Sequence, residues 1–337
     1  MRAVAARVEA QAKINLFLRV IAREVTGYHQ IETLFCRLAL ADHVMVRPTA
    51  AGRSLRCTGE WVPAGAQGSP RRNPAWRAAA AYAAAVAERV EAPELGPPEQ
   101  NLAWKAAVGY SDAAEWPAGF EIEVEKRIPV GGGLGGGSAD AGAVLRALNA
   151  LNPEPLAPDA LLAIAGSLGA DVPFLTQDVS PLALAWGRGD RMVTLPHLPA
   201  RDVLLHVPAV GVSTADAYRW LDEHPPRNGP ATVPLEALSS WEGVACLAGN
   251  DFEEPISRQV AAVGDLLAAS RGGQVARVFG DAEIVQMTGS GSTVFRVAKA
   301  AGRRAKPLIG PWQQDGTTID LIETRSATFV EPVVLTH

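Results

Sequence analysis

Alternating hydrophobic and polar residues predict two strands in the N-terminal half of the chain. In residues 120–125, apolar side chains alternate with glutamates, which is the period of two expected for a half-buried strand. In residues 10–18, every second position carries Ala, Ile or Leu. Gln11, Lys13 and Asn15 then share the opposite face, so Lys13 and Asn15 are predicted to point the same way.

Helical spacing appears further along the chain. Residues 139–151 place Ala, Val and Leu side chains on one face, which predicts a helix. A second helix around 161–168 is expected to end at Gly169, directly before a rigid turn that exposes Asp171. A third, alanine-rich helix is expected to open at Pro74. Apolar runs at 182–187 and 202–208 read as strands, and a second glycine loop, "TGSGST", lies between two further strand-like runs.

The segment between the strand at 120–125 and the helix at 139–151 is "IPVGGGLGGGS", residues 128–138. Glycine costs about 1 kcal/mol against alanine in regular structure, so this density needs a compensating reason. The first amides of a helix lack internal partners and lie at the positive end of its dipole, which suits an anion. Ser138 could cap the helix or offer its hydroxyl to a phosphate or metal. An ordinary glycine-rich turn capped by Ser138 is the alternative.

Two well-known nucleotide loops fit this segment poorly. A Walker A loop requires a lysine after its last glycine, but Gly137 is followed by Ser138 and Ala139. Gly131, Gly133 and Gly136 match the spacing of a dinucleotide fingerprint. That motif expects a second strand ending in an acidic residue about 20 positions on, where this chain has a proline-rich turn and another helix.

Composition restricts the class of protein. At 337 residues the chain exceeds the usual size of a single core, so two domains are expected. The composition is 48% hydrophobic and the net charge is -5, which argues against a broad nucleic-acid surface. Cys36, Cys57 and Cys246 lack metal-ligand spacing and are expected to be free thiols in a reducing compartment. Neither a signal peptide nor a membrane span fits, so we expect a cytoplasmic protein without a protein-held metal site.

Several motifs, in order, resemble one enzyme superfamily, the small-molecule kinases that include galactokinase, homoserine kinase and mevalonate kinase. They are "AKINLFL", "GYHQIETLF", "NLAWKAA", the glycine loop, "LGADVPF", "GRGD", "GVSTADAY", "GND" and "TGSGSTVF". The glycine loop points only to the superfamily. "AKIN", "GYH" and "GADVPF" together are similar to the kinases that act on 4-diphosphocytidyl-2-C-methyl-D-erythritol.

The resemblance implies an α+β fold of two domains with a substrate cleft between them. Residues 1–178 would form an ATP-binding domain like ribosomal protein S5 domain 2. Residues 179–337 would form a ferredoxin-like substrate-binding domain whose tail could return to the first. A monomer or a homodimer with a small-molecule substrate is expected.

The same resemblance implies roles for individual residues. Asp171 would accept or orient the proton of the acceptor hydroxyl, and Lys13 would stabilise that carboxylate, with Mg²⁺ bridging oxygens of ATP. The residues implied in ATP binding are Pro129, Gly131, Gly132, Gly133, Gly135, Gly136, Gly137 and Ser138. Those implied in substrate binding are Asn15, Tyr28, His29, Thr214 and Tyr218, with Tyr28 and Tyr218 sandwiching cytosine and His29 reading its edge.

The chain departs from the family pattern at a few places. The segment from about 66 to 98 is longer than usual, Thr26 stands where aspartate is common, and Asp190 stands where glutamate is frequent. Three other functions stay open at this point. They are another kinase of the superfamily, a nicotinamide-dependent oxidoreductase, and a nucleotide-binding module without catalysis.

Overall fold

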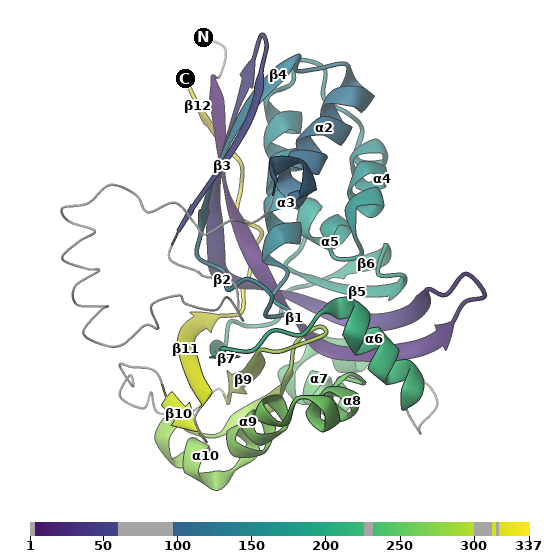
Figure 1. The fold of residues 1–337 in the computed structure, drawn as a ribbon, viewed down its shortest axis with the longest axis vertical. Coiled ribbons are helices and arrows are strands. Elements are labelled where there is room, and N and C mark those ends of the chain that lie inside the picture. Colours follow the sequence, from purple (N-terminus) through teal and green to yellow (C-terminus); the bar gives the residue numbers. More distant parts are fainter. Residues whose placement is uncertain (1–3, 60–96, 226–231, 300–311, 315–316) are drawn as a thin grey trace, which may run out of the picture.

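A computed structural model describes residues 4–59, 97–225, 232–299, 312–314 and 317–337. Its two β-sheets lie one after the other along the long axis of the molecule, each with helices packed on it (Figure 1). The helix expected to open at Pro74 lies outside the described residues, as does nearly all of the long segment at 66–98.

The first sheet has seven strands in the described part of the chain, and its main path runs β12-β1-β2-β4-β3. The long strand β2 pairs with β4 through residues 43–49 and with β5 through residues 31–36, and β6 pairs with β5. The strand bounds are β1 Ala5–Arg23, β2 His29–Thr49, β3 Arg53–Gly59, β4 Gly119–Lys126, β5 Leu182–Gly187, β6 Arg191–Leu195 and β12 Val334–Thr336. The strand predicted at 120–125 is confirmed as β4, with Phe120, Ile122 and Val124 buried.

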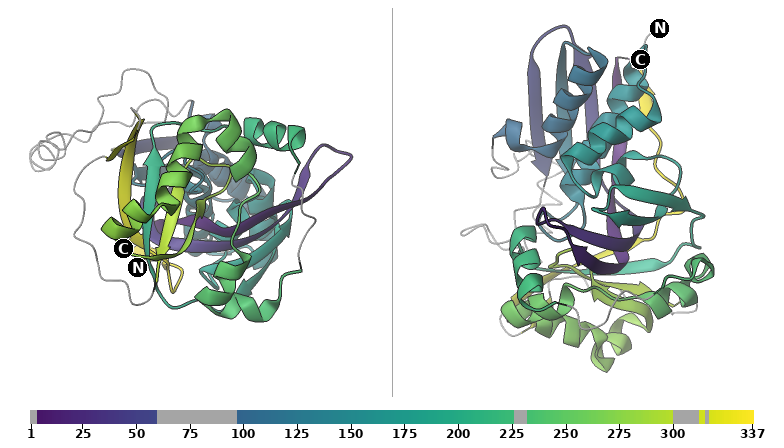
Figure 2. Two further views of the ribbon diagram at one scale, coloured as in Figure 1. Left: turned by 90° about the horizontal axis from the view of Figure 1, so that it is seen from below. Right: turned by 90° about the vertical axis from the view of Figure 1, so that its right-hand side faces the viewer.

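Helices cover one face of the first sheet (Figure 1, and the right panel of Figure 2). They are α2 Leu102–Ala114, α3 Gly136–Leu151, α4 Pro158–Leu168 and α5 Val172–Thr176, with a short 3₁₀ turn, η1, at Pro98–Gln100. Helix α3 is buried over residues 139–148 because it lies between the sheet and the other helices. A side chain at Gly142 would stand 2.6 Å from the Leu175 carbonyl oxygen, so α5 depends on that glycine for its close packing. The helices predicted at 139–151 and 161–168 are confirmed.

The second sheet has the order β10-β11-β7-β9-β8 and is antiparallel throughout its described pairs. Its strands are β7 Asp202–Pro208, β8 Ala282–Met287, β9 Val294–Ala298, β10 Trp312–Gln314 and β11 Thr317–Arg325. The helices of this half are α6 Thr214–Glu223, α7 Trp241–Leu247, α8 Glu253–Gln259, α9 Ala261–Arg271 and α10 Gly273–Phe279, with the 3₁₀ turn η2 at Leu235–Ser239. The strands predicted at 182–187 and 202–208 are confirmed, but they belong to different sheets.

The chain passes from the first sheet to the second between Leu195 and Asp202. This point lies beyond the division at 178 expected from the sequence, because β5 pairs with β2 and β6 pairs with β5, so both belong to the first sheet. The C-terminal strand β12 returns to pair with β1, as residues 5–7 face residues 334–336. Mixed helix and strand content in two sheets agrees with the expected α+β class.

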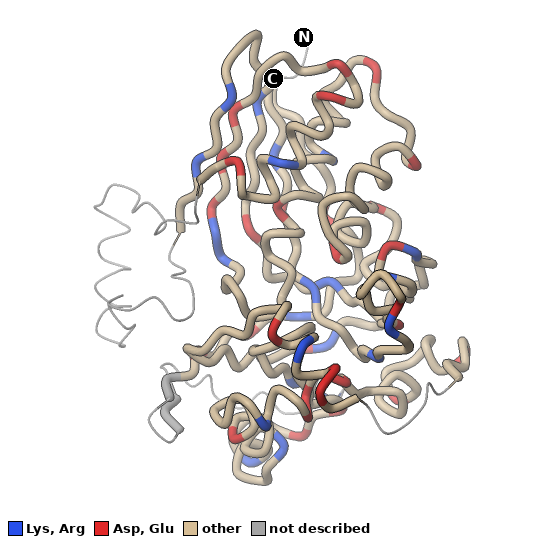
Figure 3. Tube along the Cα trace, turned by 45° about the vertical axis from the view of Figure 1, so that its right-hand side comes forward, with Lys and Arg blue, Asp and Glu red and all other residues tan. Residues whose placement is uncertain are grey.

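Two properties of the whole molecule bear on its partners. Basic and acidic residues are interspersed along the trace of both halves (Figure 3). None of the helices in the described ranges combines the length and the apolar character needed to span a bilayer.

Candidate active site

The glycine segment joins β4 to α3, so the predicted order of strand, loop and helix is confirmed. Gly131, Gly133 and Gly135 have φ of 77°, 75° and 72°, a left-handed conformation that other residues rarely adopt. A side chain at Gly133 would also stand 2.2 Å from the Thr288 carbonyl oxygen. Close contact with the second glycine loop is thus one reason for the glycine density.

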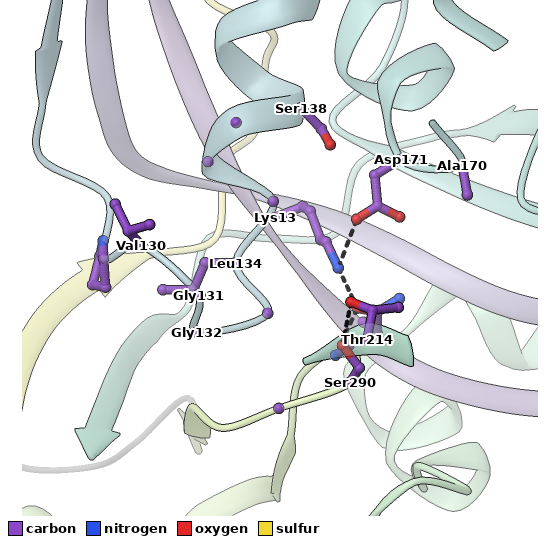
Figure 4. A pocket seen from close by; sticks show the side chains of 18 of the residues that line it. Lys13, Val130, Gly131, Gly132, Leu134, Ser138, Ala170, Asp171, Thr214 and Ser290 are labelled. Atoms are coloured by element: carbon purple, nitrogen blue, oxygen red, sulfur yellow. Dashed lines mark hydrogen bonds and ion pairs between the residues drawn. The ribbon is translucent and has the colours of Figure 1, made fainter. Parts of the chain in front are cut away.

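Helix α3 begins at Gly136 without a side-chain cap, because its N-cap residue is Gly135. Ser138 lies inside the first turn, and its side chain points into the adjoining cavity (Figure 4). Of the two roles considered for Ser138, capping the helix is wrong. With no side chain capping them, the first amides of α3 keep hydrogen-bonding capacity for an anion.

Lys13 and Asp171 lie together although 158 positions separate them. Lys13 Nζ is 3.1 Å from Asp171 Oδ2, and the two side chains are 3% and 28% exposed. Lys13 comes from the middle of β1, where its amide donates to the Leu134 carbonyl of the glycine loop at 3.0 Å. Asp171 directly precedes α5. A buried cation therefore meets a partly exposed carboxylate beside the loop.

Asn15 lies on the same side of β1 as Lys13, as the period of two predicted. Its Oδ1 accepts from Lys13 Nζ at 2.8 Å and from the Gly289 amide at 3.0 Å, and its Nδ2 donates to Thr33 at 2.8 Å. Asn15 lines the cavity and also hydrogen-bonds to protein groups through both atoms of its amide. It links the catalytic candidate Lys13 to the second glycine loop.

The second glycine loop, residues 288–293, forms the wall opposite α3. Gly289 and Gly291 have φ of 57° and 86°, and Ser290 Oγ lies 3.1 Å from Thr214 Oγ1 at the start of α6. Sequence reasoning assigned this loop no role. The sequence shows two glycines between two strand-like runs. This pattern predicts a tight turn but does not indicate which residues the turn contacts.

A cavity of about 520 Å³ lies between these elements, a size typical of small-molecule sites. Its lining includes every residue expected to contact ATP, together with Lys13, Asn15, Asp171, Thr214 and Tyr218 (Figure 4). The wall also includes Phe252 and residues 289–291 from the second half of the chain. The structure thus brings most of the predicted residues around one space.

Tyr28 and His29 depart from the expected arrangement. The His29 ring stacks on Tyr218 with centroids 4.5 Å apart, and His29 Nε2 lies 2.7 Å from Asp222 Oδ1. Tyr28 is 58% exposed and carries the Arg188 guanidinium 4.0 Å from its ring centre. Neither Tyr28 nor His29 is among the residues that line the cavity. In this structure the His29 ring covers one face of the Tyr218 ring.

Tyr218 differs electrostatically from an ordinary tyrosine. Burial, reinforced by the negative charge of Asp171, raises the pKa of its hydroxyl to about 12. The hydroxyl therefore stays protonated at neutral pH. Tyr218 also packs edge-on against Phe252 at 4.9 Å, which fixes its ring plane.

A buried cluster of Asp42, Lys126 and Asp140 lies beneath the glycine loop. Lys126 Nζ bonds to Asp42 and, at 2.6 Å, to Asp140. Asp42 also accepts the amides of Arg127 and Ile128, the latter at 2.7 Å. Lys126 and Asp140 both border the cavity. The cluster ties the end of β4 and the start of α3 to β2.

The ionisation of this cluster follows from its burial. Burial raises the pKa of Asp140 to about 8, an effect that the Lys126 charge only partly offsets. Burial by itself would lower the pKa of Lys126. The interactions with Asp140 and Asp42 outweigh this effect, so the Lys126 pKa is raised. Sequence reasoning missed all three residues. The available signal was a charged residue at position 140, among the small residues that form the first turns of the helix.

Residues 101–178 match the GHMP kinases N terminal domain family, so the fold and the loop define a small-molecule kinase of this class. Relatives from Deinococcus radiodurans and Moorella thermoacetica, both 4-diphosphocytidyl-2-C-methyl-D-erythritol kinases, are 33% and 34% identical. The alignments cover 87% and 94% of this chain and 84% and 97% of theirs. A crystal structure of a 4-(cytidine 5'-diphospho)-2C-methyl-D-erythritol kinase is 30% identical, with a TM-score of 0.63 over 95% of this chain and 99% of its own. The chain belongs to the 4-diphosphocytidyl-2-C-methyl-D-erythritol kinase family.

Proposed function

We propose that this kinase transfers the γ-phosphoryl group of ATP to the 2-hydroxyl of 4-diphosphocytidyl-2-C-methyl-D-erythritol, a step in making isoprenoid precursors. The observation that carries the proposal is the Lys13–Asp171 pair, 3.1 Å apart. It borders the same cavity as the glycine loop and the uncapped start of α3. The family relatives carry the name of this activity.

In the proposed reaction, Asp171 accepts the proton of the acceptor hydroxyl as its oxygen forms a bond to the γ-phosphorus. The bond from that phosphorus to the β-γ bridging oxygen breaks, and ADP leaves. Lys13 holds the Asp171 carboxylate in place and offsets negative charge that develops beside it. Its attachment to Asn15 at 2.8 Å supports this role, because the ammonium is held from two sides.

The loop Pro129–Ser138 would hold the phosphates of ATP through main-chain amides at the start of α3. The donor set fits a magnesium ion that arrives with ATP. Such an ion keeps mostly phosphate and water oxygens and needs few protein groups. Ser138 Oγ would hold it, and the described residues contain no cluster of three acidic, His or Cys side chains that would form a protein cage. When bound, the ion would neutralise phosphate charge.

The cytidine end of the substrate would bind near Tyr218, with Thr214, Asn15, Tyr28 and His29 as its further contacts. Stacking of a base on an aromatic ring contributes about 1–3 kcal/mol. Since the His29 ring occupies the Tyr218 face, 4.5 Å away, we propose that cytosine displaces or replaces that contact. The glycine loop, which leaves the first sheet at β4, would bind ATP. Residues from the second half of the chain would complete the substrate site.

A coupled assay of ADP release tests the proposal. Wild-type enzyme should release ADP with the diphosphocytidyl substrate and much less with its uridine analogue. Asp171→Asn should lower kcat about a hundredfold or more with little change in the KM for ATP, as expected for loss of a positioned base. Asp190→Asn is the matched control outside the cavity and should keep its kcat. No turnover by wild type, or unchanged turnover by Asp171→Asn, would refute the assignment.

A further inference from the structure

Arg37 is a buried arginine held by main-chain carbonyls. It lies on β2 and is 1% exposed. Its Nη2 donates to the carbonyl oxygens of Phe174 and Gln177 at 2.7 and 2.8 Å. Burial lowers the pKa of the guanidinium to about 9, so it stays charged at neutral pH. A charge placed this deeply needs strong partners, and here α5 and the residue after it supply them.

The carbonyls that Arg37 engages lie at the C-terminal end of α5. This helix has only five residues, Val172–Thr176, and so short a helix is not stable without tertiary contacts. The C-terminal carbonyls of a helix lack internal partners and carry its negative end, which favours a cation there. Asp171 is the residue directly before α5. Whatever fixes α5 therefore also fixes the backbone of Asp171.

A continuous stack of side chains joins Arg37 to Lys13. The Arg37 guanidinium lies 5.2 Å from the centre of the Phe174 ring. The Phe174 ring stacks on Phe35 with centroids 4.9 Å apart and an interplanar angle of 16°. Lys13 Nζ lies 5.6 Å from the centre of the Phe35 ring. Both phenylalanines are completely buried, so the stack has little room to shift.

The strand register explains why the two cations can act together. Lys13 on β1 faces Arg37 on β2 directly across the antiparallel ladder. Lys13 holds the carboxylate of Asp171, and Arg37 holds the helix that follows it. Both ends of the 3.1 Å ion pair are thus attached to the same pair of strands.

We propose that Arg37 is a positioning residue for the phosphoryl-transfer centre, which sets the place of Asp171 relative to Lys13 by fixing α5. The inference rests on the proposed function for the identity of the reaction. Arg37 does not border the cavity, so it acts only through α5 and the aromatic stack. A displacement of about 1 Å at a reacting group can cost about a hundredfold in rate.

Arg37→Met tests this inference because it keeps much of the side-chain volume and removes both hydrogen bonds. We expect kcat to fall about tenfold or more while the KM for ATP changes less than about twofold, since the glycine loop is untouched. In an Asp171→Asn background the same change should cause no further loss of kcat, because both substitutions disable one unit. Independent, multiplying losses in the double variant would overturn the inference.

A structural role alone would produce a different pattern. Val46→Ala removes buried volume from β2 at a residue that is 0% exposed and borders no part of the cavity. It should lower the melting temperature comparably and leave kcat unchanged. If Arg37→Met does not fold, Phe174→Leu removes the ring stack but keeps the carbonyl bonds and should give the same selective loss of kcat. Equal losses of kcat in Val46→Ala would count against the inference.

A crystal structure of Arg37→Met gives a readout that does not depend on the substrate. The distance from Lys13 Nζ to Asp171 Oδ2, 3.1 Å here, should increase. An unchanged distance would refute the positioning role. An inactive wild type would instead refute the proposed function, so the two failures are distinguishable.

Discussion

Removing the Asp42 carboxylate should destabilise the protein by about 3–5 kcal/mol, because three donors lose one buried acceptor. Asp42 is 0% exposed and accepts from Lys126 Nζ and from the amides of Arg127 and Ile128. An amide left without an acceptor costs about 1–3 kcal/mol, and breaking a buried ion pair about 3–5 kcal/mol. Asp140 remains as a partner of Lys126 in Asp42→Ala, and the bond from the Arg127 amide is only partly buried, so both terms should lie towards the low end of their ranges.

Asp42→Asn separates the two backbone hydrogen bonds, which Oδ1 accepts, from the charge and the bond to Lys126, which Oδ2 accepts. The amide oxygen can still accept from the two backbone amides, and Asp140 still faces Lys126. We expect a smaller cost of about 1–2 kcal/mol. Because Lys126 lies beneath the start of α3 and borders the cavity, Asp42→Ala should also raise the KM for ATP.

Urea unfolding followed by circular dichroism measures these free energies. Asp112 provides the matched control, since it is exposed on α2 and its change to alanine should stay within about 0.5 kcal/mol. A loss below about 1 kcal/mol in Asp42→Ala would show that the buried cluster contributes little net stability. Equal losses in the alanine and asparagine variants would refute the separation of charge from hydrogen bonding.

Three further predictions concern the cavity and its surroundings. Gly137→Ala should weaken ATP binding without unfolding the protein, since the added methyl meets only one side-chain atom, at 3.8 Å. Gly166→Ala, whose methyl would have nothing within 4 Å, is the control. Equal ATP affinity in the two variants would show that the loop has only a structural role. Tyr218→Ala should raise the KM for the diphosphocytidyl substrate about tenfold and spare that for ATP; the reverse result would exclude Tyr218 from the cytidine site. Burial raises the pKa of Asp140 to about 8, so this residue binds a proton more tightly in the folded state. The free energy of unfolding of wild type, relative to that of Asp140→Asn, should therefore fall as pH rises from about 4 to 8. A difference between the two proteins that stays constant over this range in urea titrations would refute the prediction.

Local patterns predicted the order of strand, glycine loop and helix because much of it depends on residues close in the chain. The period of two at 120–125, the positive φ of Gly131, Gly133 and Gly135, and the helix that follows all depend on neighbours in the chain. The prediction that Lys13 and Asn15 point to the same side of the strand is confirmed for a related reason. Bulges flank this pair, between residues 11 and 13 and between 15 and 17, so the alternation from 13 to 15 remains intact.

Burial and long-range pairing were beyond what local patterns determine. A lone lysine on a strand usually lies at a solvated edge, whereas Lys13 is buried between β2, which pairs with it on one side, and the glycine loop, whose Leu134 carbonyl accepts from its amide on the other. The cluster of Asp42, Lys126 and Asp140 joins three separate elements, so spacing along the chain carries no sign of it. The contact between the His29 ring and Tyr218 also joins residues far apart in the chain, so local patterns could not predict it.

The glycine density of the loop follows from how the nearby cations are used. Lys13 and Lys126 are the only basic residues that border the cavity in the described part of the chain. Lys13 is paired with Asp171, and Lys126 is bonded to Asp42 and Asp140, so each already has protein partners. The loop also has no lysine of its own, unlike a Walker A loop. In the proposed function, phosphate would then be held chiefly by main-chain amides, which it reaches only where no side chain intervenes. A loop of this kind needs glycine at position after position, and that is the pattern from 131 to 137.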